Sequence, residues 1–412
     1  MNLTLFLFAL QRAGQLSWAA FVGCLRQRAL TRAFLLVLFL PLLFAVQLIH
    51  WLGFLLDELL FPDYHQVRVN RPLFIIGVPR SGTTFLQRVM AADPQLTTLS
   101  TWECLLAPSI SQRRCWLALA WLDRKLKGPL ACLLRNLQRH LNRRFDAVHV
   151  LRLEMPEEDY LTLLPLFSCF LLILAVPEDR FLWRLGWFDQ DLQPRHQKRL
   201  LSFYHAMQQK HLYVHGPDRT LLVKNPAFCS WIPALRELYP DCRIICPFRD
   251  PLKTYRSQLS SISAGLALLQ LRRQAPQIAE QFLDLYQHAY QVLFAQIPET
   301  ADKQLIGVSM TALKNNLSNS LSDLYRQLKL PLDDAFRASL ESEAEAAAGY
   351  HSQHHYSLQI FQLDDGRAEQ VLAKAQQEFR RRWPTDPTAP VRPHQQPVDA
   401  VETAAAERLS PC

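Results

Sequence analysis

The 412-residue chain carries 45 Lys and Arg against 37 Asp and Glu, a formal net charge of +8, with 49% hydrophobic and 20% charged residues. This is the composition of a folded protein rather than a disordered one, and its basic tilt favours anionic partners such as phosphate esters, acidic polymers or lipid headgroups. Nine cysteines without a CxxC pair argue against a disulfide framework or a zinc site, and indicate reduced thiols in a reducing compartment.

The N-terminus is strongly apolar. The first 56 residues contain no acidic residue, and residues 33–56 carry no formal charge at all. As a helix this run is long enough to cross a bilayer, although a proline, a glycine and two polar residues interrupt it. The apolar stretch at 3–25 predicts a second helix, which would pair with the first as a hairpin in the membrane plane. We therefore expect residues 1–60 to form a membrane-associated helical segment that either spans or lies in the plane.

From residue 66 onward the pattern alternates between strands and helices. Four short runs are apolar on both faces, which is typical of buried strands in a parallel sheet; they are residues 73–78, 220–224, 243–248 and 304–309. We predict an α/β fold, a P-loop-like parallel sheet flanked by helices, with a large helical insert and the apolar N-terminal helical segment. The α/β domain is placed at 66–383, and the proline-rich tail at 384–412 is expected to be disordered.

The helical insert between the first two strand runs is strongly basic over residues 112–152. Two interpretations stay open. The insert is either a solvated basic face over an ordinary core contact or a surface-lying helix that meets anionic lipid or an anionic acceptor.

The first strand run leads into the loop PRSGTT and then into an amphipathic helix. Gly77 and Gly82 have the spacing of a mononucleotide-binding loop, but Thr83 stands where such a loop has its lysine, and Arg80 lies inside the loop. The loop therefore predicts a phosphate cradle that differs from that of an ATP-binding protein.

A second segment, FRDPLKTYRS, follows the third strand run. Arg249 comes directly after the strand, and Ser257 lies eight residues later on the helix that is expected next. Parallel sheets bind ligands beyond the carboxyl ends of their strands, so this segment and the loop are expected to face one cleft. Two phosphate sites in one cleft predict a nucleotide that is phosphorylated at two places.

These residues resemble the sulfotransferases that use 3′-phosphoadenosine 5′-phosphosulfate (PAPS). The motifs RSGTT, VKNP at 223–226 and FRDP at 248–251 look more like the bacterial-type and tyrosylprotein branch than the cytosolic one. The resemblance covers roughly residues 50–383 and implies sulfuryl transfer from PAPS, as co-substrate, to a hydroxyl acceptor without a metal. It also implies that the 5′-phosphosulfate is held by Arg80, Ser81, Gly82, Thr83 and Thr84, and the 3′-phosphate by Arg249 and Ser257.

Three residues are the candidate catalytic groups. Arg80 would neutralise the oxygens of the transferred group, and Lys224, at the end of the second strand run, would approach the leaving bridge oxygen. Glu103 in STWECLL is the candidate base, because bacterial-type relatives carry a similar Trp-Glu, and we expect a partly apolar wall to raise its pKa. Alternatively Glu103 caps a helix, and in that case Glu157 and Glu158 are the next candidates for the base.

Two other classes of function stay open. A P-loop kinase or NTPase is disfavoured by the missing lysine at Thr83 and by the lack of an acidic residue after Lys224. A membrane-bound nucleotide-binding scaffold would bind the donor and lack a base. The acceptor, a lipid, a glycan or another hydroxyl compound, cannot be read from the chain, nor can the oligomeric state. We expect no nucleic-acid partner, and we expect the cytoplasmic face of the inner membrane, where the donor is made.

Overall fold

A computed structural model describes residues 2–129, 132, 133, 136, 153–297, 304–334, 336, 337, 340 and 358–383. Most of the basic insert beyond residue 129 and the tail that was predicted to be disordered lie outside these described residues, so those two predictions stay predictions.

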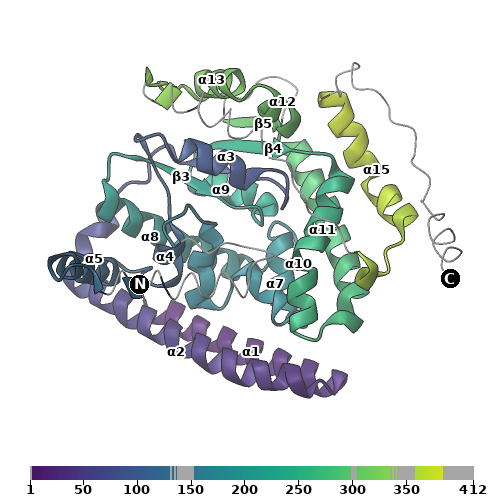
Figure 1. Cartoon of the computed structure of the whole chain (residues 1–412), viewed down its shortest axis with the longest axis horizontal. Helices are drawn as coiled ribbons and strands as arrows, with labels where there is room; N and C mark the ends of the chain where they lie inside the picture. Colours follow the sequence, from purple (N-terminus) through teal and green to yellow (C-terminus); the bar gives the residue numbers. More distant parts are fainter. Residues whose placement is uncertain are drawn as a thin grey trace, which may run out of the picture.

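A parallel sheet forms the centre of the molecule, between two layers of helices (Figure 1). Its strands are β1 (Leu73–Ile75), β2 (Leu96–Thr97), β3 (Thr220–Lys224), β4 (Arg243–Phe248) and β5 (Leu305–Ser309), in the order β2-β3-β1-β4-β5. Every pair of neighbours is parallel. The predicted parallel sheet is confirmed, and β2 is an additional short strand that the apolar pattern did not reveal.

The helices of the described residues surround this sheet. The α-helices are α1 (Leu3–Gln27), α2 (Leu30–Leu60), α3 (Thr83–Met90), α4 (Thr101–Leu105), α5 (Ile110–Lys125), α7 (Arg180–Arg184), α8 (Pro194–His215), α9 (Ile232–Leu238), α10 (Pro251–Leu268), α11 (Ala275–Gln296), α12 (Met310–Asn315), α13 (Leu317–Leu328) and α15 (Asp365–Arg382). The 3₁₀ helices are η1 (Pro62–Gln66), η2 (Asp159–Leu166), η3 (Phe170–Leu174), η4 (Leu185–Trp187), η5 (Cys229–Trp231), η6 (Arg272–Gln274) and η7 (Gln359–Phe361).

Each face of the sheet builds its own core, because successive side chains of a strand point to opposite sides. Leu73 and Ile75 of β1 pack with α3, α12 and α13 in the smaller core. Phe74 and Ile76 point the other way, into the larger core, to which α8, α10 and α11 contribute. Strands that are buried on both faces account for the continuous apolar runs in the sequence.

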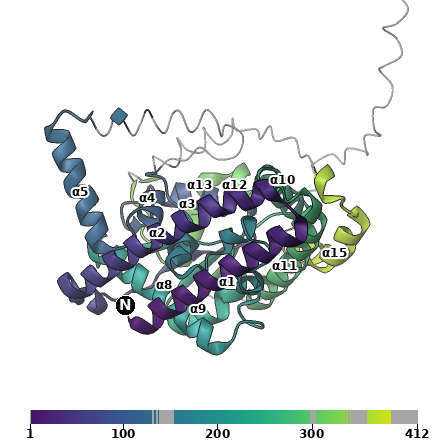
Figure 2. The same cartoon turned by 90° about the horizontal axis from the view of Figure 1, so that it is seen from below.

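The first two helices form an antiparallel hairpin along one side of the larger core (Figures 1 and 2). Phe8 and Leu16 of α1, and Trp51 and Phe54 of α2, belong to the same apolar cluster as the sheet residues. Among the described residues, α2 is the helix that is long and apolar enough to cross a membrane, and only 17% of its most apolar window is buried. Core helices and signal sequences meet the same criterion, so it does not by itself assign a membrane.

Candidate active site

The loop between β1 and α3 has a backbone that requires its glycines. A Cβ added to Gly77 would lie 2.9 Å from the carbonyl oxygen of Pro247. Gly82 has φ 104° and an added Cβ would overlap the thioether of Met310, while Arg80 holds a left-handed φ of 70°. Left-handed residues in such a turn direct successive backbone N–H groups to one side, which creates a concave anion site.

The loop fits an anionic group in two further respects. Helix α3 begins without a side-chain cap and without an acidic residue in its first turn, so its first N–H groups are free to bind an anion. The hydroxyl of Ser81 is buried and has no hydrogen-bond partner among the described residues. Tyr286 of α11 donates a hydrogen bond of 2.8 Å to the carbonyl oxygen of Pro79, which fixes the start of the loop.

The second predicted phosphate segment lies beside this loop. Helix α10 begins at Pro251, one residue after Asp250, whose carboxylate accepts from the N–H of Lys253 at 2.8 Å. Ser257 is buried on this helix, and its hydroxyl accepts a 3.0 Å hydrogen bond from Nε of Arg80. The structure thus brings together two motifs that are 177 residues apart in the sequence. Arg249 lies at the start of the same segment, half-buried.

Lys224 reaches the loop from the carboxyl end of β3, the strand next to β1. Its side chain is 2% exposed, and Nζ lies 3.3 Å from the hydroxyl oxygen of Thr84 and 2.6 Å from a carboxylate oxygen of Glu158. The structure therefore brings three of the predicted elements together at the carboxyl edge of the sheet: the loop, Lys224 and Ser257. Glu158 lies at the same site through its contact with Lys224.

Glu158 reaches this edge because the segment at 153–157 pairs with the chain that follows β2. The N–H of Trp102 donates to the carbonyl of Leu153, and that of Glu157 donates to Leu99, each at 2.9 Å. Gln87 of α3 also donates to the carbonyl of Glu157, at 3.0 Å. These contacts hold the acidic stretch against the loop helix, an arrangement that the local sequence pattern does not indicate.

The next residue, Asp159, is enclosed. Its carboxylate accepts hydrogen bonds from the hydroxyl of Tyr204 and from the side-chain amides of Gln208 and Asn225. Burial raises the pKa of Asp159 to about 7, against the opposing effects of the Tyr204 hydrogen bond and the charge of Lys224. In the sequence these acids after a proline have the pattern of an ordinary helix start, so the buried network was missed.

Glu103 lies in a different environment from the expected one. It forms a capping box at the start of α4, where one carboxylate oxygen accepts from the N–H and the hydroxyl of Ser100 at 2.9 and 2.6 Å. The other oxygen lies 2.6 Å from Nε2 of His215 and 3.6 Å from Nε of Arg113. The prediction of a raised pKa is wrong: burial alone would raise the pKa of Glu103, but Arg113, His211 and His215 outweigh it and hold the pKa well below its usual range.

This cluster also has the residue types of a metal site. His211 and His215 are four residues apart on α8, and with Glu103 they place three possible ligand atoms within 4.8 Å of one another. Burial lowers the pKa of His211 to about 4, which keeps its imidazole neutral. The guanidinium of Arg113 faces the same Oε1 atom of Glu103 as His215 does. A positive charge therefore already lies beside the carboxylate oxygen that would bind a metal ion.

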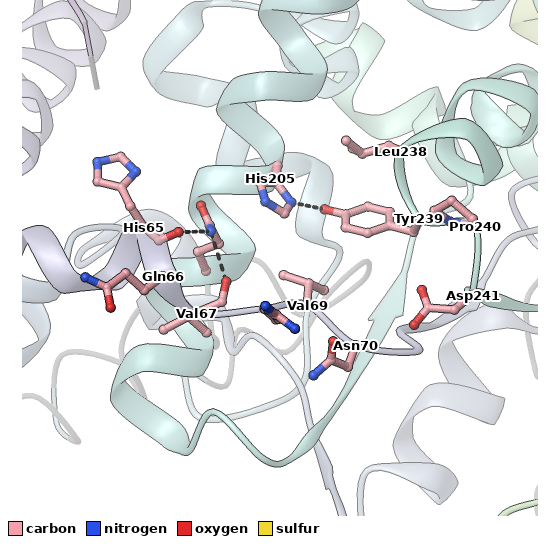
Figure 3. A pocket seen from close by; sticks show the side chains of 12 residues that line it. His65, Gln66, Val67, Val69, Asn70, His205, Leu238, Tyr239, Pro240 and Asp241 are labelled. Atoms are coloured by element: carbon pink, nitrogen blue, oxygen red, sulfur yellow. Dashed lines mark hydrogen bonds between the residues drawn. The ribbon is translucent and has the colours of Figure 1, made fainter.

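A cavity of about 560 Å³ lies at the other edge of the sheet, near the amino ends of β1 and β4 (Figure 3). Some of its polar groups are paired with one another: Gln209 donates to the carbonyls of His65 and Val67, and His205 contacts the hydroxyl of Tyr239. Its lining contains no residue of the loop, nor Lys224 or Ser257, so the cavity is separate from the candidate site.

Comparison with known proteins agrees with this geometry. The model of the Sulfotransferase family matches residues 72–334. Sulfotransferase STF9 from Mycobacterium avium is 18% identical, with a TM-score of 0.62 over 81% of this chain and 82% of that one. Sulfotransferase STF1 from Mycobacterium tuberculosis is 20% identical, with a TM-score of 0.56 over 76% and 79%. At these identities the two structures show a shared fold. No curated protein matches the chain significantly.

Proposed function

Because the chain belongs to the sulfotransferase family, we propose that it transfers a sulfuryl group from PAPS to a hydroxyl acceptor. The observation that carries the proposal is the 3.0 Å hydrogen bond between Arg80 and Ser257. It joins the loop expected to hold the 5′-phosphosulfate to the helix expected to hold the 3′-phosphate. A donor with phosphates at two separate positions suits two adjoining anion sites better than a triphosphate does.

We assign the donor site to the same residues. The N–H groups of Gly82, Thr83 and Thr84 and the hydroxyls of Ser81, Thr83 and Thr84 would hold the 5′-phosphosulfate, and Arg80 would add a guanidinium to its oxygens. Arg249 and Ser257 would hold the 3′-phosphate. PAPS, when bound, supplies the sulfuryl group as a sulfate–phosphate anhydride. Lys224 would place its ammonium next to Thr84, where it stabilises the charge that develops on the leaving phosphate oxygen.

For the general base we propose Glu158, with Glu103 as the alternative. Glu158 is 21% exposed and lies 2.6 Å from Nζ of Lys224, so its carboxylate is at the same place as the cation that would hold the leaving group. The carboxylate of Glu103 is 3% exposed and is engaged by Ser100 and His215. A base must reach the acceptor hydroxyl, take its proton as the new oxygen–sulfur bond forms, and later release the proton to water.

Turnover of three matched variants tests this assignment. Glu158→Gln should lower the rate about 10² to 10⁴-fold at unchanged affinity for 3′-phosphoadenosine 5′-phosphate, because general base catalysis contributes about that much. Glu157→Gln, next to it, and Glu103→Gln should keep the rate within a few-fold. A slow Glu103→Gln enzyme beside a normal Glu158→Gln enzyme would reverse the assignment.

The donor itself is tested by calorimetry on the full-length protein. We expect 3′-phosphoadenosine 5′-phosphate to bind tightly in the presence of a chelator and ATP to bind weakly. Preference for ATP, or loss of binding on chelation, would refute the PAPS assignment. Labelled PAPS offered with a cell lipid extract and with a glycan extract then identifies the acceptor class.

We also propose that the protein acts at a membrane, on a lipid or a membrane-proximal glycan. The proposal rests on the exposed apolar surface of α2. The cytoplasmic face of the inner membrane is the expected side, because PAPS is made in the cytoplasm. Fractionation that leaves the full-length protein soluble and monomeric without detergent would contradict it.

A further inference from the structure

We propose that the hairpin of α1 and α2, continued by α5, lies flat in one leaflet of an anionic membrane, and that α2 does not cross the bilayer. The inference concerns how the protein is held, and it stands whether or not PAPS is the donor. We call the exposed outer surface of these three helices the apolar face. Its largest exposed side chains on the hairpin include Leu3, Leu7, Trp18, Phe21, Leu25, Leu30, Phe34, Val37, Leu38, Leu42, Ile49, Leu52, Leu55 and Leu59.

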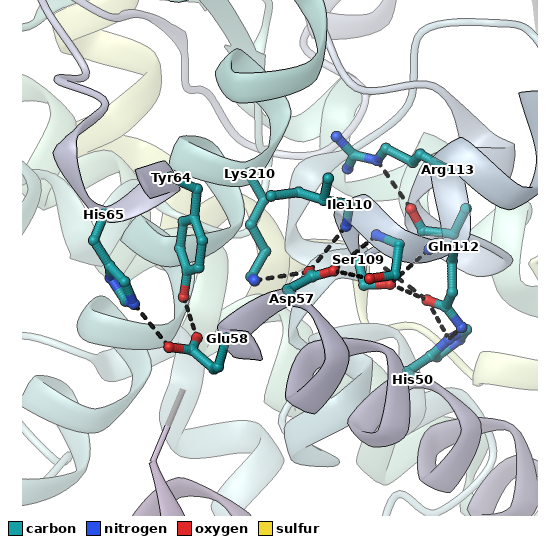
Figure 4. Close-up of polar contacts among 12 residues, drawn as sticks. His50, Asp57, Glu58, Tyr64, His65, Ser109, Ile110, Gln112, Arg113 and Lys210 are labelled. Atoms are coloured by element: carbon teal, nitrogen blue, oxygen red, sulfur yellow. Dashed lines mark hydrogen bonds and ion pairs between the residues drawn. The ribbon is translucent and has the colours of Figure 1, made fainter. Parts of the chain in front are cut away.

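Both ends of α2 are fixed to the same folded body. Near its start, the fully buried guanidinium of Arg32 forms a two-pronged ion pair with Glu178, at 2.6 and 2.7 Å, and donates to the carbonyl of Ala175 at 3.1 Å. Near its end, the fully buried carboxylate of Asp57 lies 2.8 Å from Nζ of Lys210 on α8 (Figure 4). Each pair is an anchor point with a charge that has no access to water.

The distance between the two anchor points excludes a crossing. Arg32 and Asp57 are 25 positions apart, which is roughly 37 Å along an α-helix, longer than a hydrocarbon core of roughly 30 Å. In a spanning helix these residues would lie on opposite sides of the membrane. Both instead bind the same body, so α2 must run along the membrane surface as long as the two ion pairs are formed.

The two polar residues that interrupt the apolar sequence at 33–56 both face this body. Gln47 and His50 are each 3% exposed, and His50 lies between the side chain of Gln112 and the carbonyl of Leu105 (Figure 4). In α1, Arg12 is 2% exposed and pairs with Asp179 at 2.8 Å. Along residues 33–56, α2 therefore turns its polar side chains to the protein and only apolar side chains to the outside, whereas α1 also exposes Gln11, Gln15 and Ser17.

The outer surface has the composition of a lipid-facing one. Between residues 3 and 56 the exposed charged residues are Arg26, in the last turn of α1, and Arg28, which follows that helix directly. Trp18 and Leu30 are 66% and 85% exposed. Along residues 33–56 of α2 every exposed side chain is apolar, whereas the cores of protein interfaces are typically about two-thirds apolar, so this surface suits hydrocarbon better than a second copy. The two arginines suit anionic headgroups at the end of the hairpin.

Helix α5 extends the same surface. It contacts α2 through Asp57, which accepts from the N–H groups of Ile110 and Ser111 at 2.9 and 2.7 Å. Figure 1 shows α5 beside one end of the hairpin and at its level, and Figure 2 shows it pointing away from the body. From 114 to 125 every side chain of α5 except that of Asp123 is exposed, and the large ones are apolar or basic, the composition of helices that lie at a membrane interface: Arg114, Trp116, Leu117, Leu119, Trp121, Leu122, Arg124 and Lys125.

Vesicle flotation of the full-length protein tests the apolar face. Detergent-purified protein is mixed with vesicles of phosphatidylcholine, alone or with phosphatidylglycerol, and the detergent is removed. We expect Leu38→Glu/Leu42→Glu to lower the floated fraction at least tenfold, because both exposed side chains would place a charge in hydrocarbon. Leu268→Glu, equally exposed on α10, should float like the wild type. Thermal unfolding and nucleotide binding identify any variant that has lost its fold.

The charge and the orientation are tested separately. Arg26→Gln/Arg28→Gln should lower the preference for phosphatidylglycerol and leave flotation on neutral vesicles, while Arg114, Arg124 and Lys125 of α5 keep the rest of that preference. With protein bound only from outside, Arg26→Cys and Asp63→Cys, which replace exposed residues beyond the two ends of α2, should both react with a membrane-impermeant thiol reagent added outside. A site that reacts only after the vesicles are opened would overturn the in-plane geometry, and a detergent-free dimer that ignores vesicles would overturn the lipid assignment in favour of a second copy.

Discussion

Replacing Asp57 by asparagine tests the contact that fixes the end of α2. The carboxylate is fully buried and accepts from four donors: Nζ of Lys210, the N–H groups of Ile110 and Ser111, and the hydroxyl of Ser111, all within 2.9 Å. The ammonium of Lys210 lies 3.7 Å from the ring centroid of Tyr64, away from water. Asp57→Asn keeps the shape and leaves this ammonium without its counter-charge.

The expected loss is about 3 to 5 kcal/mol in the free energy of unfolding, the usual cost of breaking a buried ion pair from one side. Lys210→Met should cost less, about 1 to 3 kcal/mol, because Asp57 keeps the two N–H groups and the hydroxyl at the start of α5. Burial lowers the pKa of Lys210, and Asp57 opposes this shift. In Asp57→Asn, Lys210 therefore loses its proton at a lower pH in the folded state than in the unfolded chain. The stability deficit of this variant relative to the wild type should shrink as pH rises.

Denaturant unfolding in a mild detergent measures these differences. The double variant Asp57→Asn/Lys210→Met should be more stable than Asp57→Asn alone, since it removes the unpaired charge, and the double-mutant cycle gives the coupling energy. An Asp57→Asn protein within about 1 kcal/mol of the wild type, or one that Lys210→Met fails to rescue, would refute the reasoning.

Three further predictions concern the candidate site. Arg249→Ala should weaken binding of 3′-phosphoadenosine 5′-phosphate by about 1.5 to 3 kcal/mol in calorimetry, the range for a hydrogen bond to a charged group, while exposed Lys253→Ala should not. Asp159 should contribute stability that is lost as pH rises from about 4 to about 7, because in that window the unfolded chain loses the proton that folded Asp159 keeps. Buried His211 contributes a slope of the opposite sign in this window, so the test is the difference: the stability of Asp159→Asn should rise more steeply with pH than that of the wild type in pH-dependent unfolding. Gly82→Ala should lower nucleotide affinity at least tenfold, because its φ of 104° and the thioether of Met310 leave no room for a methyl group; Gly265→Ala, which meets open space, should bind normally.

The sheet was predictable because its strands are buried on both faces. Runs such as 220–224 and 243–248 give a continuous apolar signal that does not depend on what packs against them. Strand β2 has two residues, too few for any periodicity to register. The loop and its Ser257 partner were predictable for a different reason, since each motif encodes a local backbone shape and the topology brings the carboxyl ends of β1 and β4 together.

The charged contacts were not predictable in the same way. Lys224 and Glu158 are 66 residues apart, and Asp57 and Lys210 are 153 apart, so no local pattern links them. Residues 33–56 were correctly recognised as apolar, but apolarity does not say which side of a helix packs on the protein and which side is exposed. The pKa of Glu103 was predicted in the wrong direction because its cationic neighbours come from α5 and α8, outside the short motif.

The ion pairs of the hairpin also bear on how the molecule can be divided. Residues 3–60 supply the counter-charges of three groups elsewhere in the fold, Asp179, Glu178 and Lys210. A chain shortened to begin after α2 would retain those charges without their counter-charges and would uncover a side of the larger core. The hairpin of α1 and α2 is thus an integral part of the fold and not a detachable leader. A lineage could gain or lose it only together with neutral or newly paired residues at those three positions.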